Sequence, residues 1–222
     1  MDGSRECANL ISDEICTYFN LNASGRYVPR SIFVDLHPEY LNSFMAGQSG
    51  SLHNTKNVIP GEYDPIRNWA AARYEYGPEV IENVMNVVRK ETELCDRLQG
   101  FQLAHSLGGG TGSGLGSLII SQLREEYSEK VISAFSVVPS FKVCEFPIEP
   151  YHTAFTAHYL IHDVDASYLF DNETLCADLV SSGLDPKSSQ GVKEAALTEL
   201  IVPAMVGSTH GFRFPHHATP DL

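Results

Sequence analysis

Apolar residues gather in three short runs that are typical of buried β-strands. Residues 31–34 precede Asp35, residues 101–105 form a second run, and residues 131–138 form a third that is rich in β-branched side chains. Between the runs, apolar positions recur at helical spacing; they are Val80, Ile81, Val84, Val87 and Val88 after Gly77-Pro78, and Leu115, Leu118, Ile119 and Leu123 further on. Strands that alternate with helices predict an α/β fold, with a mostly parallel sheet, helices on both faces and ligands at the carboxyl ends of the strands.

The remaining segments carry weaker patterns. Residues 37–76 contain three prolines and scattered glycines, and are predicted to be mostly loop. Residues 151–159 are predicted to be helical and residues 181–190 to be a polar connection. From Gly191 onward the apolar spacing indicates a helix, which Pro203 is expected to break because an interior proline costs about 3 kcal/mol.

A glycine-rich segment follows the second apolar run. Five glycines occur among residues 108–114, where the chain is expected to pass from a strand to a helix. Without Cβ atoms the backbone can turn sharply, and its N–H groups can converge on an anion at the start of the helix. The segment has no lysine and lacks the spacing of the two common nucleotide motifs, Gly-x4-Gly-Lys-Ser/Thr and Gly-x-Gly-x-x-Gly. It therefore predicts a phosphate site of another type, the alternative being a plain glycine turn without a ligand.

Composition narrows the class of protein. The 222 residues, 43% of them hydrophobic, suffice for one domain with a sizeable core. A net charge of −13 and a pI near 5.0 argue against binding nucleic acid or an anionic membrane through a basic surface. Five cysteines without a Cys-x-x-Cys pair indicate reduced thiols rather than disulfides or a zinc site. With no secretory signal and no apolar run of about 20 residues, the chain is expected to be soluble and intracellular.

The glycine segment closely resembles one family. Residues 108–114 are identical to the phosphate-binding loop of tubulins, and the flanking residues 95–107 and 120–127 look like β-tubulin rather than α-tubulin. Similarity covers residues 14–222, including 26–36, 86–91, 135–140, 149–151 and 171–173, whereas residues 1–13 are unmatched. The resemblance implies a divergent, truncated tubulin/FtsZ GTPase domain with a Rossmann-like α/β fold. Tubulins begin with the strand that forms the middle of this sheet, so the central first strand is expected to be missing.

The resemblance also implies a set of nucleotide contacts. Backbone amides of the glycine loop, with a serine just before it, would hold the phosphates; these residues are Ser106, Gly109, Gly110, Thr111 and Gly112. Glu149 would accept hydrogen bonds from the ribose hydroxyls, and Asn172 would read the guanine edge through its side-chain amide. Each side chain has a structural alternative: Ser106 could bond to the backbone at the strand end, Glu149 could be a solvated loop residue, and Asn172 could cap a helix or turn.

Several positions depart from the family pattern. His37 stands where the family has a glutamate that helps to hold magnesium, and nitrogen is a ligand that Mg²⁺ disfavours, so any Mg²⁺ site is expected to be weakened. In the second phosphate loop, before Trp69, only Asn68 survives, although Arg67 could supply charge. The tyrosine that stacks on guanine aligns with Glu194, and a second guanine-reading asparagine aligns with Thr198.

Catalytic residues are not retained in the same way. The family's activating loop, Gly-x-x-Asn-x-Asp, aligns with residues 216–221, of which only Asp221 matches. The two adjacent histidines there lack a third ligand at defined spacing, which favours a surface loop over a metal site. The chain also stops before the part of the family that supplies the water-activating residue to the next subunit. No catalytic or metal residue is therefore assigned, and GTP hydrolysis is expected to be slow or absent in isolation.

Three functions are compared on this basis. The first is a β-tubulin-like GTP-binding protein that contributes to cytoplasmic microtubules, with an α-tubulin-like subunit as partner. The alternative, which the altered positions motivate, is a non-enzymatic tubulin-like fragment that binds tubulin or its folding chaperones without nucleotide. A nicotinamide-dependent oxidoreductase is disfavoured because the glycine spacing does not match.

Overall fold

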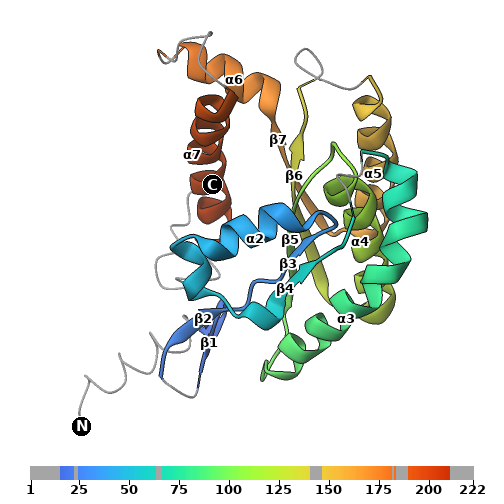
Figure 1. Cartoon of the computed structure of the whole chain (residues 1–222), viewed down its shortest axis with the longest axis vertical. Coiled ribbons are helices and arrows are strands. Elements are labelled where there is room, and N and C mark those ends of the chain that lie inside the picture. Colours follow the sequence, from blue (N-terminus) through green and yellow to red (C-terminus); the bar gives the residue numbers. More distant parts are fainter. Residues whose placement is uncertain are drawn as a thin grey trace.

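The computed structural model describes residues 16–22, 25–63, 67–140, 147–181, 183 and 190–210, with the backbone alone at 190–195 (Figure 1). The strands are β1 (Phe19–Leu21), β2 (Tyr27–Pro29), β3 (Phe33–Asp35), β4 (Val58–Pro60), β5 (Gly100–Ser106), β6 (Val131–Val138) and β7 (Ala166–Asp171). The helices are α2 (Pro38–Ala46), α3 (Gly77–Glu93), α4 (Gly116–Glu126), α5 (Glu149–Asp163), α6 (Asn172–Ser181) and α7 (Gln190–Ser208). Shorter helical turns are η1 (Ser49–Leu52), η2 (Thr55–Asn57), η3 (Ala71–Tyr76) and η4 (Thr111–Leu115).

Parallel strands form the centre of the fold. Strands β5, β6 and β7 pair in that order, with Ser106 opposite Val137 and Val138 opposite Asp171. Strands β3 and β4 form a separate parallel pair, and β1 and β2 form a short antiparallel hairpin. Helices α3, α4 and α5 lie on one side of the strands and α2, α6 and α7 on the other (Figure 1). The predicted α/β fold, with its mostly parallel sheet and helices on both faces, is confirmed.

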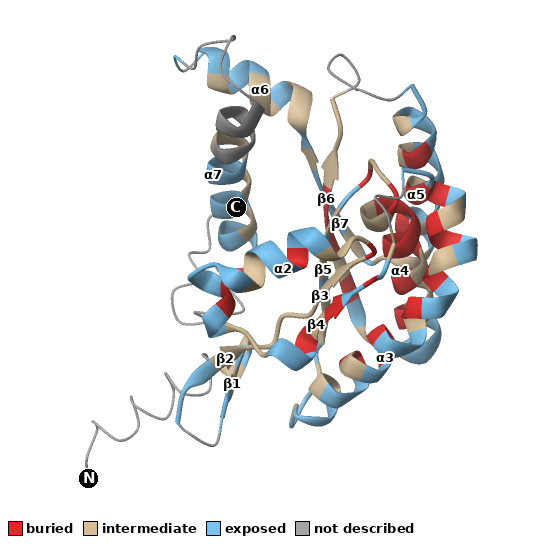
Figure 2. Cartoon of the chain, viewed as in Figure 1, coloured by how far each residue is buried: buried red, intermediate tan, exposed pale blue. Residues whose placement is uncertain are grey.

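The predicted helices form because their apolar positions fall on one side. Val80, Val84 and Val88 are spaced by four residues along α3, and all three are buried. They pack in one cluster with Leu36 and Ile132 from the strand side, and with residues of α4. Buried residues, red in Figure 2, gather where α3, α4 and α5 face the strands. This packing holds the helix that follows the glycine loop firmly against the sheet.

The prediction that residues 37–76 are mostly loop is wrong in part. Helix α2 begins with Pro38, whose fixed φ angle suits the first turn of a helix. Its only buried residue is Leu41. The ring of Phe44 packs against that of Phe33, with 4.8 Å between the ring centroids. Pro38 thus starts a helix and Pro60 ends a strand, β4. Helix α2 depends on tertiary contacts that a pattern with one buried position does not reveal.

The expected break at Pro203 is also wrong, because α7 continues through it. A proline inside a helix leaves the carbonyl oxygen four residues earlier without its N–H partner. This oxygen belongs to Glu199; Glu199 and Pro203 are both exposed, so water can hydrate it. The helix predicted at residues 151–159 is confirmed within α5, whereas the polar connection predicted at 181–190 lies mostly outside the described residues. No helix in the described part of the chain combines the length and apolarity needed to cross a membrane.

Candidate functional site

The glycine loop connects the carboxyl end of β5 to η4. Residues 107–110 form the turn, and η4 and α4 continue from it as one helical segment. The chain therefore passes from a parallel strand to the N-terminus of a helix within four residues. This strand was predicted to be buried, but its residues are half-buried or exposed. The first N–H groups of a helix have no partner within it and carry a partial positive charge, which suits an anion.

Two glycines of the loop are required by its geometry. Gly109 has a φ angle of 74°, a left-handed conformation that side chains rarely adopt. A Cβ atom on Gly112 would lie 2.7 Å from the backbone oxygen of Ser106 and 2.9 Å from its nitrogen, so the helix start is pressed against the end of β5. This close approach places the N–H groups of Gly110, Thr111 and Gly112 at the carboxyl edge of the sheet, where the sequence predicted a phosphate site.

The side chain of Thr111 forms its hydrogen bonds at the end of β3 and not with a group above the loop. Its Oγ1 donates to Asp35 Oδ1 at 2.9 Å and accepts from the N–H of Leu36 at 3.4 Å. Asp35 Oδ1 also accepts from the N–H of His37 at 3.1 Å. The role predicted for Thr111 thus rests on its backbone amide, and its hydroxyl ties the loop to the neighbouring strand. Asp35 was recognised in the sequence only as the end of a strand.

Ser106 adopts the backbone-bonded alternative. Its Oγ accepts a hydrogen bond from the N–H of Gly108 at 3.1 Å, which closes the first turn of the loop. In this position the hydroxyl shapes the loop as an acceptor, and this bond leaves its own hydrogen able to donate to a phosphate oxygen.

Glu149 lies beside the loop. It is the half-buried first residue of α5, and a Cβ atom on Gly108 would lie 3.8 Å from its carboxyl carbon. The carboxylate therefore borders the turn of the glycine loop, a position that the ribose role and the solvated-loop alternative both allow.

Asn172 begins α6 at the carboxyl end of β7. Its Oδ1 is buried and has no hydrogen-bond partner. Asp171 provides the cap instead, because its carboxylate accepts from the N–H of Glu173 at 3.0 Å and from the hydroxyl of Thr174 at 2.7 Å. These contacts therefore disfavour the alternative in which Asn172 caps the helix. A buried acceptor without a partner costs free energy, and a bound donor would remove that cost.

The sheet brings these residues to one edge. Ser106 on β5 is opposite Val137, and Asp171 on β7 is opposite Val138, so the loop and Asn172 flank the end of β6. Strand β3 ends at the same edge, where Asp35 contacts Thr111.

A metal site is poorly formed here. The Nδ1 atom of His37 is buried without a hydrogen-bond partner. The centroid of the His37 ring lies 5.6 Å from that of the Tyr40 ring. Asp35 is already hydrogen-bonded to Thr111 and to the backbone. Over the described ranges, no three His, Cys, Asp or Glu side chains are grouped as metal ligands would be. These residues do not fit Mg²⁺ well, because it prefers oxygen ligands in near-octahedral geometry.

Other positions of the predicted site contribute less. Asn68 caps the short helical segment that leads into η3, since its Oδ1 accepts from the N–H of Ala70 at 2.9 Å. Thr198 is exposed on α7. The side chain of Glu194, the rest of the second phosphate loop at 64–66, and the segment 216–221 with Asp221 lie outside the described residues.

His105 is a residue of the site that sequence reasoning missed. It lies on β5 below the loop, where Nδ1 is 2.8 Å from the carbonyl oxygen of Gly112 and Nε2 is 2.8 Å from Ser136 Oγ on β6. Burial lowers the pKa of His105 below its ordinary value, against the opposing effect of the Gly112 carbonyl. A polar residue inside an apolar strand run was the available signal.

A cavity of about 240 Å³ lies between β3 and β5. Its lining residues come from the β3 region, from β5 and from the helical segment after the loop; they are Ile32, Val34, Asp35, Leu103, Ala104, His105, Thr111, Gly112, Leu115 and Ile119. Among the described strands, β3 pairs only with β4 and β5 only with β6. The expectation of a missing central strand concerns residues 1–13, which lie outside the described residues, so it stays a prediction.

Comparison with known families adds one finding. The family model described as Tubulin/FtsZ family, GTPase domain, matches residues 4–179 of this chain. The match includes all seven strands, the glycine loop, Glu149 and Asn172 among the described residues.

Proposed function

The chain belongs to the Tubulin/FtsZ family through its GTPase domain, and from this premise we propose that it is a β-tubulin-like protein that binds GTP at the glycine loop. The observation that carries the proposal is the loop itself. It joins a parallel strand to a helix N-terminus, with Gly109 in a left-handed conformation and Gly112 against the backbone of Ser106. This geometry is suited to hold phosphates through backbone N–H groups in a chain whose net charge is −13.

Asn172 supports guanine as the base. Guanine presents adjacent N–H donors and one carbonyl acceptor, whereas a side-chain amide carries one acceptor and two donors. The Oδ1 of Asn172 is buried and unpaired at the same edge of the sheet as the loop. A guanine N–H would satisfy it, and Glu149 beside the loop would accept from the ribose hydroxyls.

Turnover and assembly belong to the same proposal. We assign no catalytic residue and expect hydrolysis to be slow, because residues 216–221 keep only Asp221 of the family's activating loop. The partner is an α-tubulin-like subunit, and the location is the cytoplasmic microtubule. Mg²⁺ has no role in this proposal, because His37 stands where the family has a carboxylate.

One observation favours a second candidate function. Asp35 Oδ1 is hydrogen-bonded to Thr111 and to the N–H of His37, and the His37 side chain adds no oxygen ligand. The residues that would hold a metal ion are therefore the part of the site that resembles the family least. A tubulin-like protein that binds tubulin or its folding chaperones without nucleotide would tolerate this change. A pull-down with the purified chain that recovers neither class of protein would count against this candidate.

Equilibrium binding of a fluorescent GTP analogue tests the main proposal. The full chain is titrated with and without Mg²⁺, and the analogue is competed with GTP and with ATP. Displacement by GTP alone is expected. ATP displacing as well as GTP, or no binding by a folded chain, would overturn the guanine assignment or the nucleotide site respectively.

Replacing Asn172 tests the base contact. The Asn172→Ala change is expected to lower the preference for GTP over ATP by roughly tenfold, because about one net hydrogen bond to the base is lost. Asn83→Ala, at an exposed asparagine on α3, is the matched control and should leave the preference unchanged. Equal GTP affinity in all three proteins would mean that Asn172 does not read the base.

A further inference from the structure

The imidazole of His105 connects the glycine loop to the middle of the sheet. Its Nδ1 faces the carbonyl oxygen of Gly112 in η4, and its Nε2 faces the hydroxyl of Ser136 on β6, each at 2.8 Å. Ser136 is fully buried and Gly112 belongs to the start of the helix. One side chain thus spans from β6 to the phosphate-binding turn.

The partners of the ring determine its tautomer. A carbonyl oxygen only accepts, so Nδ1 carries the hydrogen and donates to Gly112. In the neutral ring Nε2 is then an acceptor, and the hydroxyl of Ser136 donates to it. Burial favours the neutral ring, which agrees with the lowered pKa of His105.

The glycine at position 116 makes room for this contact. A Cβ atom there would lie 3.2 Å from Nδ1 of His105, closer than side chains normally allow. The ring therefore lies directly under the first turn of the helix.

Holding the Gly112 carbonyl also orients the opposite side of its peptide. The chain has no cis peptide bonds among its described residues, so the N–H of Ser113 points opposite to the carbonyl of Gly112. With the carbonyl directed down toward His105, this N–H is directed toward the N-terminal end of the helix, where an anion would lie.

We propose that His105 is a positioning residue that fixes the phosphate-binding turn from below, as the neutral Nδ1–H tautomer that the Gly112 carbonyl requires and that Ser136 supports by donating to Nε2. Its effect on nucleotide rests on the proposed function, because the ring touches the loop and not the ligand. The tautomer and the contact with Gly112 are properties of the chain without nucleotide.

Two amide substitutions separate the two ring nitrogens. In His105→Asn the introduced side-chain amide would reach the position of Nδ1, whereas the longer amide in His105→Gln would reach that of Nε2. His105→Asn is expected to keep the affinity for the fluorescent GTP analogue within about threefold, and His105→Gln to lower it about tenfold, as one lost hydrogen bond predicts. Equal losses in both variants, or a loss only in His105→Asn, would overturn the proposal.

Nitrogen-15 NMR of the imidazole tests the tautomer in the unaltered chain. The spectrum is expected to show a protonated Nδ1 and an unprotonated Nε2 at pH 7. A protonated Nε2 with an unprotonated Nδ1 would overturn the proposal even if both variants failed to fold. If the chain bound no nucleotide but showed the Nδ1–H tautomer, the proposed function would fail and the contact below the loop would stand.

Discussion

Thr111 contributes to the glycine loop through two groups, its backbone N–H and its hydroxyl. Its N–H lies at the helix start, where a phosphate is expected, while Oγ1 bonds to Asp35 at the end of β3 and to the N–H of Leu36 just after it. These two hydrogen bonds connect the end of β3 directly to the glycine loop. The residue therefore contributes to stability as well as to the site.

Thr111→Val is expected to destabilise the chain. The valine has nearly the same shape but leaves the acceptor Asp35 Oδ1 and the N–H of Leu36 without the hydroxyl, which should cost about 1–3 kcal/mol of unfolding free energy. Urea denaturation measures this cost. Thr111→Ser keeps the hydroxyl and should lose less; a serine variant less stable than the valine variant would contradict the explanation.

At this scale the sequence anticipates which residues lie near the loop but not which atoms are used. Gly109 and Gly112 shape the loop that the motif indicates, and Glu149 borders it. The hydroxyls of Ser106 and Thr111 are bonded within the protein, and the pairing of His105 with Ser136, 31 residues apart, follows from the register of β5 and β6. Local patterns do not specify such long-range register.

Asp165 connects three elements near the amino end of the sheet. Its carboxylate accepts from the N–H of Ile132 at 2.8 Å at the start of β6, and from Arg124 of α4 at 2.7 Å, just before β7 begins. These contacts, the backbone N–H first and then Arg124, hold the pKa of Asp165 below its ordinary value.

Asp165→Asn is expected to reduce the acid sensitivity of the fold. A carboxyl whose pKa is lowered by folding adds stability above its unfolded pKa, about 3.9, and that stability is lost as the pH falls through the folded pKa. The variant should therefore be less stable than the unaltered chain at pH 7, and the difference should shrink as the pH falls below about 4. Urea titrations across this range measure the difference.

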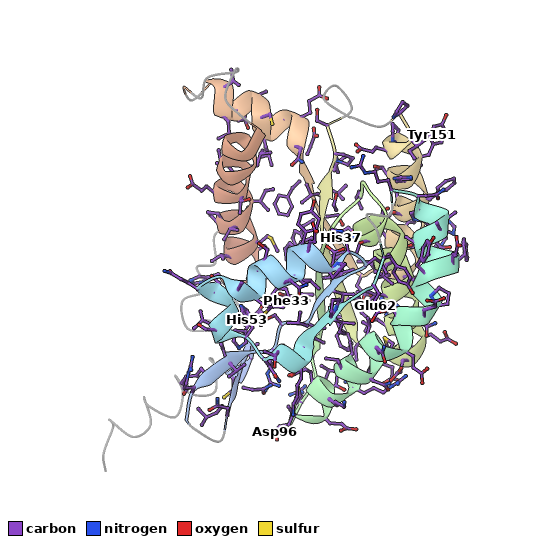
Figure 3. All side chains as sticks on the ribbon, viewed as in Figure 1. Phe33, His37, His53, Glu62, Asp96 and Tyr151 are labelled. Atoms are coloured by element: carbon purple, nitrogen blue, oxygen red, sulfur yellow. The ribbon has the colours of Figure 1, made fainter. Side chains whose placement is uncertain are left out.

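Asp96→Asn is the matched control for this experiment. Asp96 is exposed in the loop after α3, at the end of the molecule opposite the site (Figure 3). Its replacement removes one carboxylate and leaves the contacts of Asp165 in place. An equal change in acid sensitivity in both variants would show that total charge, rather than the contacts of Asp165, determines the response.

The predictability of elements depends on how many of their residues are buried. The run at 131–138 coincides with β6, and the spacing of Val80, Val84 and Val88 marks α3, because repeated burial leaves a repeated pattern. Helix α2 has only Leu41 buried, and α7 has a proline on its exposed side. Their formation depends on contacts and hydration that the order of residues does not state.

At the scale of the whole molecule, the net charge and the unpaired strand edges have opposite effects on self-association. The chain carries a net charge of −13, which resists self-association by repulsion. The cavity between β3 and β5 leaves strand edges without a neighbour in the described part of the chain, and such edges can pair with other chains.

Salt is therefore expected to promote self-association, and Ala104→Lys to reduce it. Ala104 is exposed on β5 at the wall of the cavity, where a lysine would discourage pairing with another edge. Sedimentation velocity at low and high salt measures the effect. Asn83→Lys changes the net charge equally on α3; if it reduced association as much, charge alone and not the edge would be responsible.

The same cavity has a consequence for how the amide hydrogens of β5 exchange with solvent. In a strand, successive N–H groups point to alternate sides. Those of β5 that point toward β6 are bonded within the parallel sheet, whereas every second one points toward the cavity. Protection from deuterium should therefore alternate residue by residue along β5, so that a strand in the middle of the molecule exchanges like one at its border.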